Sequence, residues 1–203
     1  MKLSKERKKE TWAFYTPNIR AEKAVEYMKD NIQDFENQTF YDCACGEWAL
    51  LDALWDVGKF WTTLEKEDVK ICRDKWYRVC KLDFLSDDAV DYCLWLREKE
   101  NLVIFTNPPY FKLRQEQYPD LRDFYWTNDS VELFYRRIID LIRPKYLCWF
   151  NKCDLWQSPS FQDFRNDLYF RWYELKSIFL SDSKSWNLSW NFPIAFNIIQ
   201  DMT

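Results

Sequence analysis

The stretch Asn101–Phe111, NLVIFTNPPYF, carries the clearest signal for the fold. Residues 102–106 form a continuous apolar run that closes on a threonine, without the alternation of a strand that is exposed on one face. Such a run is typical of a parallel strand covered on both sides of its sheet. It ends at Asn107 and two prolines, which have no backbone N–H to extend a strand ladder, and Tyr110 follows. The stretch therefore predicts a buried strand followed by a turn of unusual composition.

Outward from this strand, strand and helix patterns alternate along the chain. The expected order is a helix over 20–30, a strand ending near Asp42, a tight turn at Gly46, a helix from about Glu47, strand–helix pairs over 60–75 and 77–99, the strand 102–106, a helix over 131–142, and strands over 145–150, 174–180 and 192–199. This alternation predicts an α/β fold with a mostly parallel, doubly wound sheet. Because no repeat, low-complexity tract or linker interrupts the pattern, residues 1–203 are expected to form a single domain.

The composition excludes several classes of function. Histidine is absent, which rules out Ser-His-Asp and Cys-His nucleophiles, imidazole bases and His-ligated zinc. The seven cysteines form no C-x-x-C pair, so reduced thiols are expected and no metal site. With a net charge of −4, nucleic-acid binding would depend on a local basic patch. Neither a membrane-spanning apolar run nor a signal-peptide pattern is found, and we expect a cytoplasmic protein without membrane association.

Polar or special residues follow four of the expected strands. They are the turn from Asp42 to Trp48, Glu65, the pair Asp83-Phe84, and the turn from Asn107 to Tyr110. In open α/β sheets ligands bind beyond the carboxyl ends of the strands, so these residues are expected to meet in one cleft. A turn of small residues, a carboxylate for ribose hydroxyls and a second one for an exocyclic amine suit a nucleoside cofactor. Taken singly, each acid also fits an ordinary exposed loop carboxylate.

Three motifs in this sequence resemble those of adenine-specific, S-adenosylmethionine-dependent DNA methyltransferases, over about residues 11 to 200. The motifs are Phe14-Tyr15-Thr16-Pro17, like F-x-T-P; Asp42-x-Ala44-Cys45-Gly46-x-Trp48, like D-x-A-C-G-x-G; and Asn107-Pro108-Pro109-Tyr110, like N-P-P-Y. The resemblance implies a Rossmann-like methyltransferase fold of about seven strands, preceded by a cofactor-motif arm over residues 1–19. The cofactor residues that it implies are Phe14, Tyr15, Thr16, Pro17, Asp42, Ala44, Cys45, Gly46, Glu65, Asp83 and Phe84.

The resemblance also implies a mechanism for the proline-rich turn. The side-chain carbonyl of Asn107 and the backbone carbonyl of Pro108 would accept both N6 hydrogens of a flipped adenine, directing the nitrogen lone pair at the methyl group. Pro109 would help to fix the backbone, and Tyr110 would stack on the base. The plain alternative is a proline-rich turn that only ends a strand.

Residues 107–128 are expected to form a catalytic loop that mixes cations with aromatic rings. Lys112, Arg114 and Arg122 are candidates for phosphate contacts with DNA. A mobile cover over the cleft that does not touch DNA explains the same composition. The chain offers no room for a sizeable target-recognition domain, so sequence specificity would come from its own loops, from a specificity or restriction subunit as partner, or be weak.

The chain has only two glycines but twelve tryptophans, where average usage predicts about fourteen glycines. Trp12, Trp48, Trp61, Trp76 and Trp190 stand where a turn glycine is expected. Our hypothesis is that many of these tryptophans are glycines, because some bacterial and phage genetic codes read UGA as glycine. The alternative is a diverged or inactive enzyme.

Two other functions remain open from the sequence. Protein glutamine methyltransferases also use N-P-P-Y, although they lack the F-x-T-P element. The other alternative is a catalytically inactive methyltransferase fold that serves as a DNA-binding or scaffold subunit.

Overall fold

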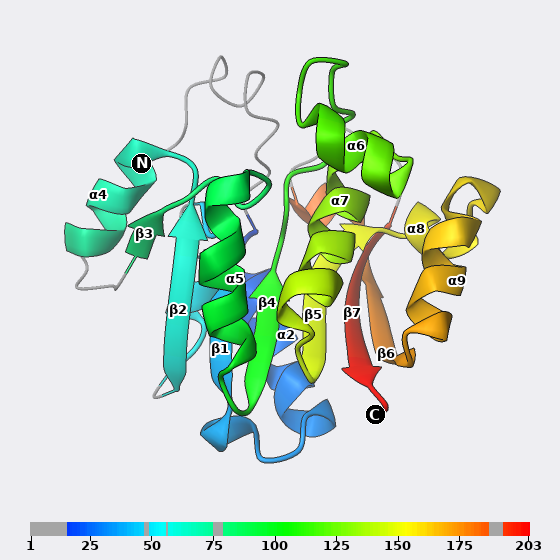
Figure 1. The fold of residues 1–203 in the computed structure, drawn as a ribbon. Helices are drawn as coiled ribbons and strands as arrows, with labels where there is room; N and C mark the ends of the chain where they lie inside the picture. The colour runs from blue at the N-terminus through cyan, green and yellow to red at the C-terminus, as the bar shows by residue number, and fades with distance from the viewer. Residues whose placement is uncertain (1–15, 47–48, 56, 75–78, 187–192) are drawn as a thin grey trace.

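A computed structural model describes residues 16–46, 49–55, 57–74, 79–186 and 193–203. Over these residues the chain forms a seven-stranded sheet in the order β3-β2-β1-β4-β5-β7-β6, with helices on both faces (Figure 1). The strands are β1 (Thr39–Asp42), β2 (Gly58–Thr63), β3 (Val79–Lys81), β4 (Leu102–Thr106), β5 (Tyr146–Lys152), β6 (Tyr173–Ser181) and β7 (Ile194–Asp201). Only β7 runs antiparallel to its neighbours. The predicted doubly wound α/β architecture is confirmed.

The helices follow the predicted alternation, with three additions. They are α2 (Asn18–Asn31), α3 (Ala49–Asp52), α4 (Lys66–Asp74), α5 (Val90–Arg97), α6 (Pro119–Tyr125), α7 (Ser130–Arg137), α8 (Asp154–Gln157) and α9 (Gln162–Phe170), with shorter turns η1 (Phe35–Asn37), η2 (Asp87–Ala89), η4 (Pro159–Phe161) and η5 (Ser183–Trp186). The helix expected over 131–142 is α7 continued by a π-helical turn, η3 (Ile138–Ile142). The sequence did not predict α8 or α9, nor the helix α6 inside the segment 107–128.

The core lies on both sides of the sheet, as the apolar run of β4 predicted. Val103 and Phe105 pack with α2 on one face, while Leu102 and Ile104 pack with α5 and α7 on the other (Figure 1). All five residues of β4 are buried. The burial on both faces makes β4 a central strand of the fold and fixes the position of its carboxyl end.

The strand order reverses direction beside β1. From β1 the chain proceeds to β2 and β3 on one side, and then returns to β4 and β5 on the other. Such a switch point leaves a crevice beyond the carboxyl ends of the two strands that flank it, here β1 and β4. The two turns that the sequence singled out, after Asp42 and after Thr106, therefore lie at the same crevice.

Two tryptophans occupy backbone conformations that favour glycine. Trp126 ends α6 with φ 54° and Trp172 follows α9 with φ 64°, both in the left-handed region. Their side chains are 93% and 65% exposed, so little burial compensates. Helices commonly end on a left-handed glycine. Both positions support the glycine hypothesis, although the sequence had not singled them out.

The expectation for Trp61 is wrong. This residue lies inside β2, not in a turn, and its side chain is buried against Val69 and Val79. A tryptophan fits that place without a special backbone conformation. Trp12, Trp48, Trp76 and Trp190 lie outside the described residues.

We expect Trp126→Gly and Trp172→Gly each to raise the free energy of unfolding by about 1 kcal/mol, because glycine relieves the left-handed strain at little loss of burial. Denaturant unfolding measures the change. Trp95→Gly is the matched control: Trp95 lies within α5 at 38% exposure, where glycine should lower the stability by about 1 kcal/mol. A loss of stability in all three variants would contradict the hypothesis at positions 126 and 172.

Candidate active site

A cleft of about 1120 Å³ opens at the carboxyl edge of the sheet. Of the residues predicted for the site, those that line it are Thr16, Asp42, Ala44, Cys45, Gly46, Glu65, Asp83, Phe84, Asn107, Pro109, Tyr110, Lys112 and Arg114. Most come from the segments that follow four strands, as the strand-end argument expected, and Thr16 lies two residues before α2. The geometry thus brings most of the candidates together in one cavity.

The remaining candidates lie elsewhere or outside the described residues. Pro17 precedes α2 as its N-cap residue, and Pro108 is buried beneath the turn. Arg122 lines a second, adjoining cavity of about 690 Å³. Phe14 and Tyr15 fall outside the part of the chain that the structure describes.

Asp42, the last residue of β1, is buried at the bottom of the cleft with 1% exposure. Its Oδ1 accepts hydrogen bonds from the backbone N–H of Ala44 (2.9 Å) and the hydroxyl of Thr106 (2.7 Å). Its Oδ2 is equally buried and accepts no hydrogen bond from the residues that the structure describes. Burial raises the pKa of Asp42 from 3.8 to about 7, against the opposing effect of the two hydrogen bonds. One carboxylate oxygen therefore has no hydrogen-bond partner among the described residues and almost no exposed surface.

The turn after Asp42 brings backbone close to the cleft. Ala44, Cys45 and Gly46 follow in sequence, and Gly46 has φ 46°, the left-handed region that glycine adopts without strain. The backbone N–H of Cys45 donates to the carbonyl of Thr62 at 3.1 Å, which ties the turn to β2. A small-residue wall of this kind lets a ligand lie against the main chain.

Asn107 is held between two distant parts of the sequence. Its Nδ2 donates to the hydroxyl of Thr16 at 3.0 Å, and its Oδ1 accepts from the hydroxyl of Tyr110. The single hydroxyl hydrogen of Tyr110 is shared with the backbone carbonyl of Phe150, in β5, at 2.8 Å. Burial raises the pKa of Tyr110, so its hydroxyl remains a protonated donor. The amide of Asn107 is thereby oriented before any substrate arrives.

The backbone after Asn107 is fixed from α7. The hydroxyl of Ser130 donates to the carbonyl of Pro109 at 2.6 Å and accepts from the N–H of Phe111 at 3.0 Å. Ser130 is fully buried at the start of α7. The proline-rich turn is therefore held by its own rings and by this hydroxyl.

Asp83, which follows β3, accepts a hydrogen bond at each of its two carboxylate oxygens. Oδ1 accepts from the N–H of Leu85 at 3.0 Å, and Oδ2 accepts from the hydroxyl of Tyr118 at 2.7 Å. Burial, followed by the hydrogen bond to Asp83, raises the pKa of Tyr118. Tyr118 reaches Asp83 from the far side of the cleft, a contact that the sequence did not reveal.

Two acidic side chains of the cleft are buried, and two basic side chains are exposed. Asp42 and Asp68 are buried, at 1% and 2% exposure, whereas Lys112 and Arg114 are exposed. Buried carboxylates favour a ligand that carries positive charge, and outer cations favour a polyanion. Among the described residues no three His, Cys, Asp or Glu side chains gather as metal ligands, and no described helix is long and apolar enough to cross a membrane.

Sequence reasoning missed several residues that complete the cleft. Asn151 and Lys152, at the carboxyl end of β5, line it, and so do Asp68 of α4 and Phe161 of η4. Asn151 could have been found, because the rule that located the other strand ends applies equally to a fifth strand. Asp68 and Phe161 had no such signal, since each lies in a helix without a motif.

No family model matches the sequence, and no curated protein matches it. Similar structures do exist. A protein from Listeria monocytogenes, assigned to the class I S-adenosylmethionine-dependent methyltransferases, superposes with a TM-score of 0.71 at 13% identity, over 93% of this chain and 61% of that one. The methyltransferase subunit of a type I restriction-modification system from Streptococcus thermophilus gives 0.67 at 14% identity, over 94% and 45%. An S-adenosylmethionine-dependent methyltransferase from Anabaena variabilis gives 0.57 at 13%, over 97% and 92%.

These likenesses define the fold as that of class I methyltransferases, with the Rossmann-like sheet predicted from the motifs. The antiparallel β7 inserted between β5 and β6 completes this arrangement. The chain spans 61% of the Listeria protein and 45% of the Streptococcus subunit. At such identities the comparisons carry the fold alone.

Proposed function

We propose that this chain transfers a methyl group from S-adenosylmethionine to N6 of adenine in DNA. The observation that carries the proposal is the hydrogen bond between Thr16 and Asn107, at 3.0 Å, in the wall of the cleft. These residues belong to two motifs that lie 91 positions apart in the sequence. Protein glutamine methyltransferases share only the second motif, so the contact favours the DNA enzyme.

The cofactor end of the cleft is formed by the turn Asp42–Gly46 with Glu65 and Asp83. Three features fit S-adenosylmethionine: close backbone approach at the turn, the buried Asp42 Oδ2, which has no hydrogen-bond partner among the described residues, and carboxylates that favour a positively charged ligand. When bound, the cofactor supplies a methyl group on a positively charged sulfur. Glu65 would accept from ribose hydroxyls and Asp83 from the exocyclic amine.

At the other end, Asn107 and Pro108 supply the chemistry. The side-chain carbonyl of Asn107 and the backbone carbonyl of Pro108 accept the two N6 hydrogens of a flipped adenine, which localises the nitrogen lone pair. A carbonyl oxygen has two lone pairs, so Asn107 Oδ1 can keep its bond from Tyr110. No imidazole is needed, which agrees with the absence of histidine.

DNA would approach across the exposed cations Arg114 and Lys112, the second of which also pairs with Asp129 at 3.0 Å. Arg122 is less available, because its guanidinium donates to the carbonyls of Arg114 and Gln115, at 3.1 and 2.8 Å. Similar structures include modification subunits of type I restriction-modification systems, and this chain spans less than half of the Streptococcus subunit. We therefore propose that target selection requires a partner subunit or further protein sequence.

Two measurements test the proposal. We expect calorimetric titration to detect S-adenosylmethionine binding by the chain or by its Trp12→Gly/Trp48→Gly variant, and labelled methyl groups to appear on adenine-containing DNA. Labelling of a Gly-Gly-Gln protein instead would favour the glutamine methyltransferase. If neither protein binds cofactor, an inactive scaffold becomes the better explanation.

A further inference from the structure

Residues 112–129 form a strap, a segment that leaves the proline-rich turn and returns to the start of α7. Its two ends pair as a short antiparallel bridge between Lys112 and Asp129, with an ion pair of 3.0 Å between their side chains. The N–H of Leu113 also donates to the carbonyl of Asn128 at 2.8 Å. The two ends of the strap are thus joined to each other. Other contacts set the path of the residues between them.

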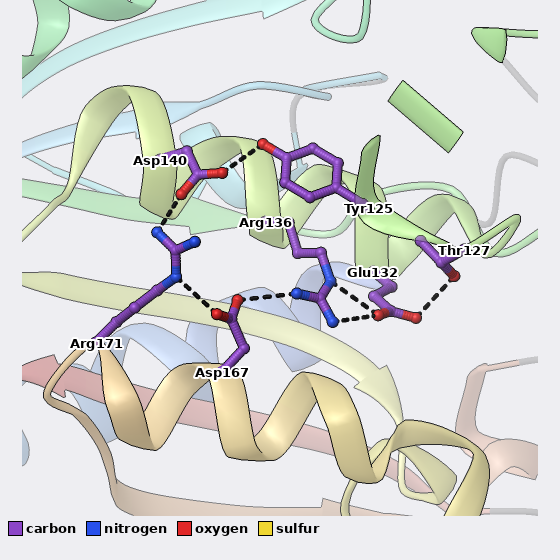
Figure 2. Close-up of polar contacts among 7 residues, drawn as sticks. All are labelled: Tyr125, Thr127, Glu132, Arg136, Asp140, Asp167 and Arg171. Carbon is purple, nitrogen blue, oxygen red and sulfur yellow. Dashed lines mark hydrogen bonds and ion pairs between the residues drawn. The ribbon is translucent and has the colours of Figure 1, made fainter. Parts of the chain in front are cut away.

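The returning half of the strap is fastened to the helices below it (Figure 2). Tyr125 donates to Asp140 at 2.5 Å, and Thr127 donates to Glu132 at 2.8 Å. Both acids belong to one network of ion pairs across α7, η3 and α9; its other members are Arg136, Asp167 and Arg171. These contacts hold the end of α6 away from the cleft.

The outgoing half crosses the cleft. Arg122 and Gln117 brace its turn, since Arg122 donates to two of its carbonyls and Gln117 Oε1 accepts from the N–H of Arg114 at 2.9 Å. At the end of this turn Tyr118 has φ 47°, a left-handed conformation that side chains other than glycine disfavour. Its hydroxyl reaches Asp83, at the end of β3 (2.7 Å). This hydrogen bond fastens the strap to the opposite wall.

We propose that Tyr118 is a cofactor-site residue that orients Asp83 and closes the strap over the cofactor end of the cleft. Tyr118 and Asp83 both line the cleft, whereas the sequence suggested for Tyr118 only base stacking, as one of several aromatic residues after the turn. The inference rests on the proposed function, because it takes the ligand to be S-adenosylmethionine or its demethylated product.

The chemistry of Asp83 explains why the contact matters to a ligand. An ionised carboxylate has about four acceptor positions, of which Leu85 and Tyr118 use two. Asp83 lines the cleft, and the two donors fix the orientation of the positions that remain. An exocyclic amine therefore meets an acceptor already aimed at it, and the same carboxylate retains the strap while the ligand is bound.

The test compares Tyr118→Phe with Tyr125→Phe. Both tyrosines lie on the strap and donate to a carboxylate, but Tyr125 bonds Asp140 outside the cleft. Calorimetry measures the affinity for S-adenosylhomocysteine, and hydrogen exchange measures the backbone of residues 112–118 with and without this ligand. We expect Tyr118→Phe to weaken binding about tenfold, because a hydrogen bond to a charged group is lost, and to remove the ligand's protection of residues 112–118. Tyr125→Phe should preserve both.

Each outcome is decisive. Equal affinity and equal protection in Tyr118→Phe and the wild type would overturn the inference and leave the proposed function intact. Equal losses in both variants would also overturn it, because they would show a general loosening of α6. Failure of the wild type to bind S-adenosylhomocysteine would overturn the proposed function, and this inference with it.

Discussion

Replacing Asn107 with alanine is expected to lower the rate of methyl transfer about 100- to 1,000-fold, the loss typical of removing one aligned hydrogen-bonding group from a transition state. The acceptor for one N6 hydrogen disappears, so the nitrogen lone pair stays delocalised into the adenine ring. The affinity for cofactor should change far less than the rate, because Asp42 and Asp83 remain in place and only Thr16 loses its bond from Asn107. Single-turnover methylation and calorimetry measure the two quantities separately.

The fold should tolerate this change. Tyr110 keeps its hydrogen bond to the carbonyl of Phe150, and Ser130 still holds the backbone at Pro109. Asn166→Ala is the matched control, since Asn166 is an exposed asparagine on α9. A wild-type rate of methylation in Asn107→Ala would contradict the catalytic role of the turn, and would leave a structural turn as its explanation.

The sequence predicted the sheet well because burial is visible in its strands. The apolar run over residues 102–106 has the composition of a two-sided strand, and β4 covers those same residues. The three helices it missed bury little: α6 has no buried residue, α8 buries only Leu155, and α9 buries only Phe164 and Leu168. Without an apolar stripe, a short helix leaves no periodic signal. Trp61 was misjudged because composition, rather than the strand pattern around it, suggested a glycine.

Some residues of the candidate site could likewise be predicted from the sequence, and others could not. Asp42 and Asn107 could be found because parallel strands bring their carboxyl ends to one edge, a rule that needs no side-chain detail. Tyr118 could not be assigned its partner, because the contact with Asp83 depends on the path of an eighteen-residue strap held by the ion pairs around Arg136 and Asp140. Contacts that depend on a loop's path follow from many weak interactions, which leave no motif.

Asp42→Asn is expected to change how stability depends on pH. Because burial raises the pKa of Asp42 to about 7, the folded protein keeps a proton that the unfolded chain releases above its ordinary value of 3.8. The free energy of unfolding therefore falls as pH rises through this window, and the loss is complete above about pH 7. Between about pH 5 and about pH 8, the Asp42 side chain should lower the free energy of unfolding by about 3 kcal/mol. Asp42→Asn should not show this loss. Denaturant unfolding of both proteins at the two pH values measures the difference.

The same carboxylate should couple cofactor binding to pH. A positively charged ligand favours ionised Asp42, so S-adenosylmethionine should bind more tightly as pH rises toward about 7, and binding near pH 6 should release a proton. In Asp42→Asn the affinity should be lower and independent of pH over this range. Calorimetry in buffers of different ionisation enthalpy counts the proton directly. Identical pH dependence in the two proteins would mean that Asp42 does not titrate in the folded state, and its buried Oδ2 would then no longer support a cofactor contact.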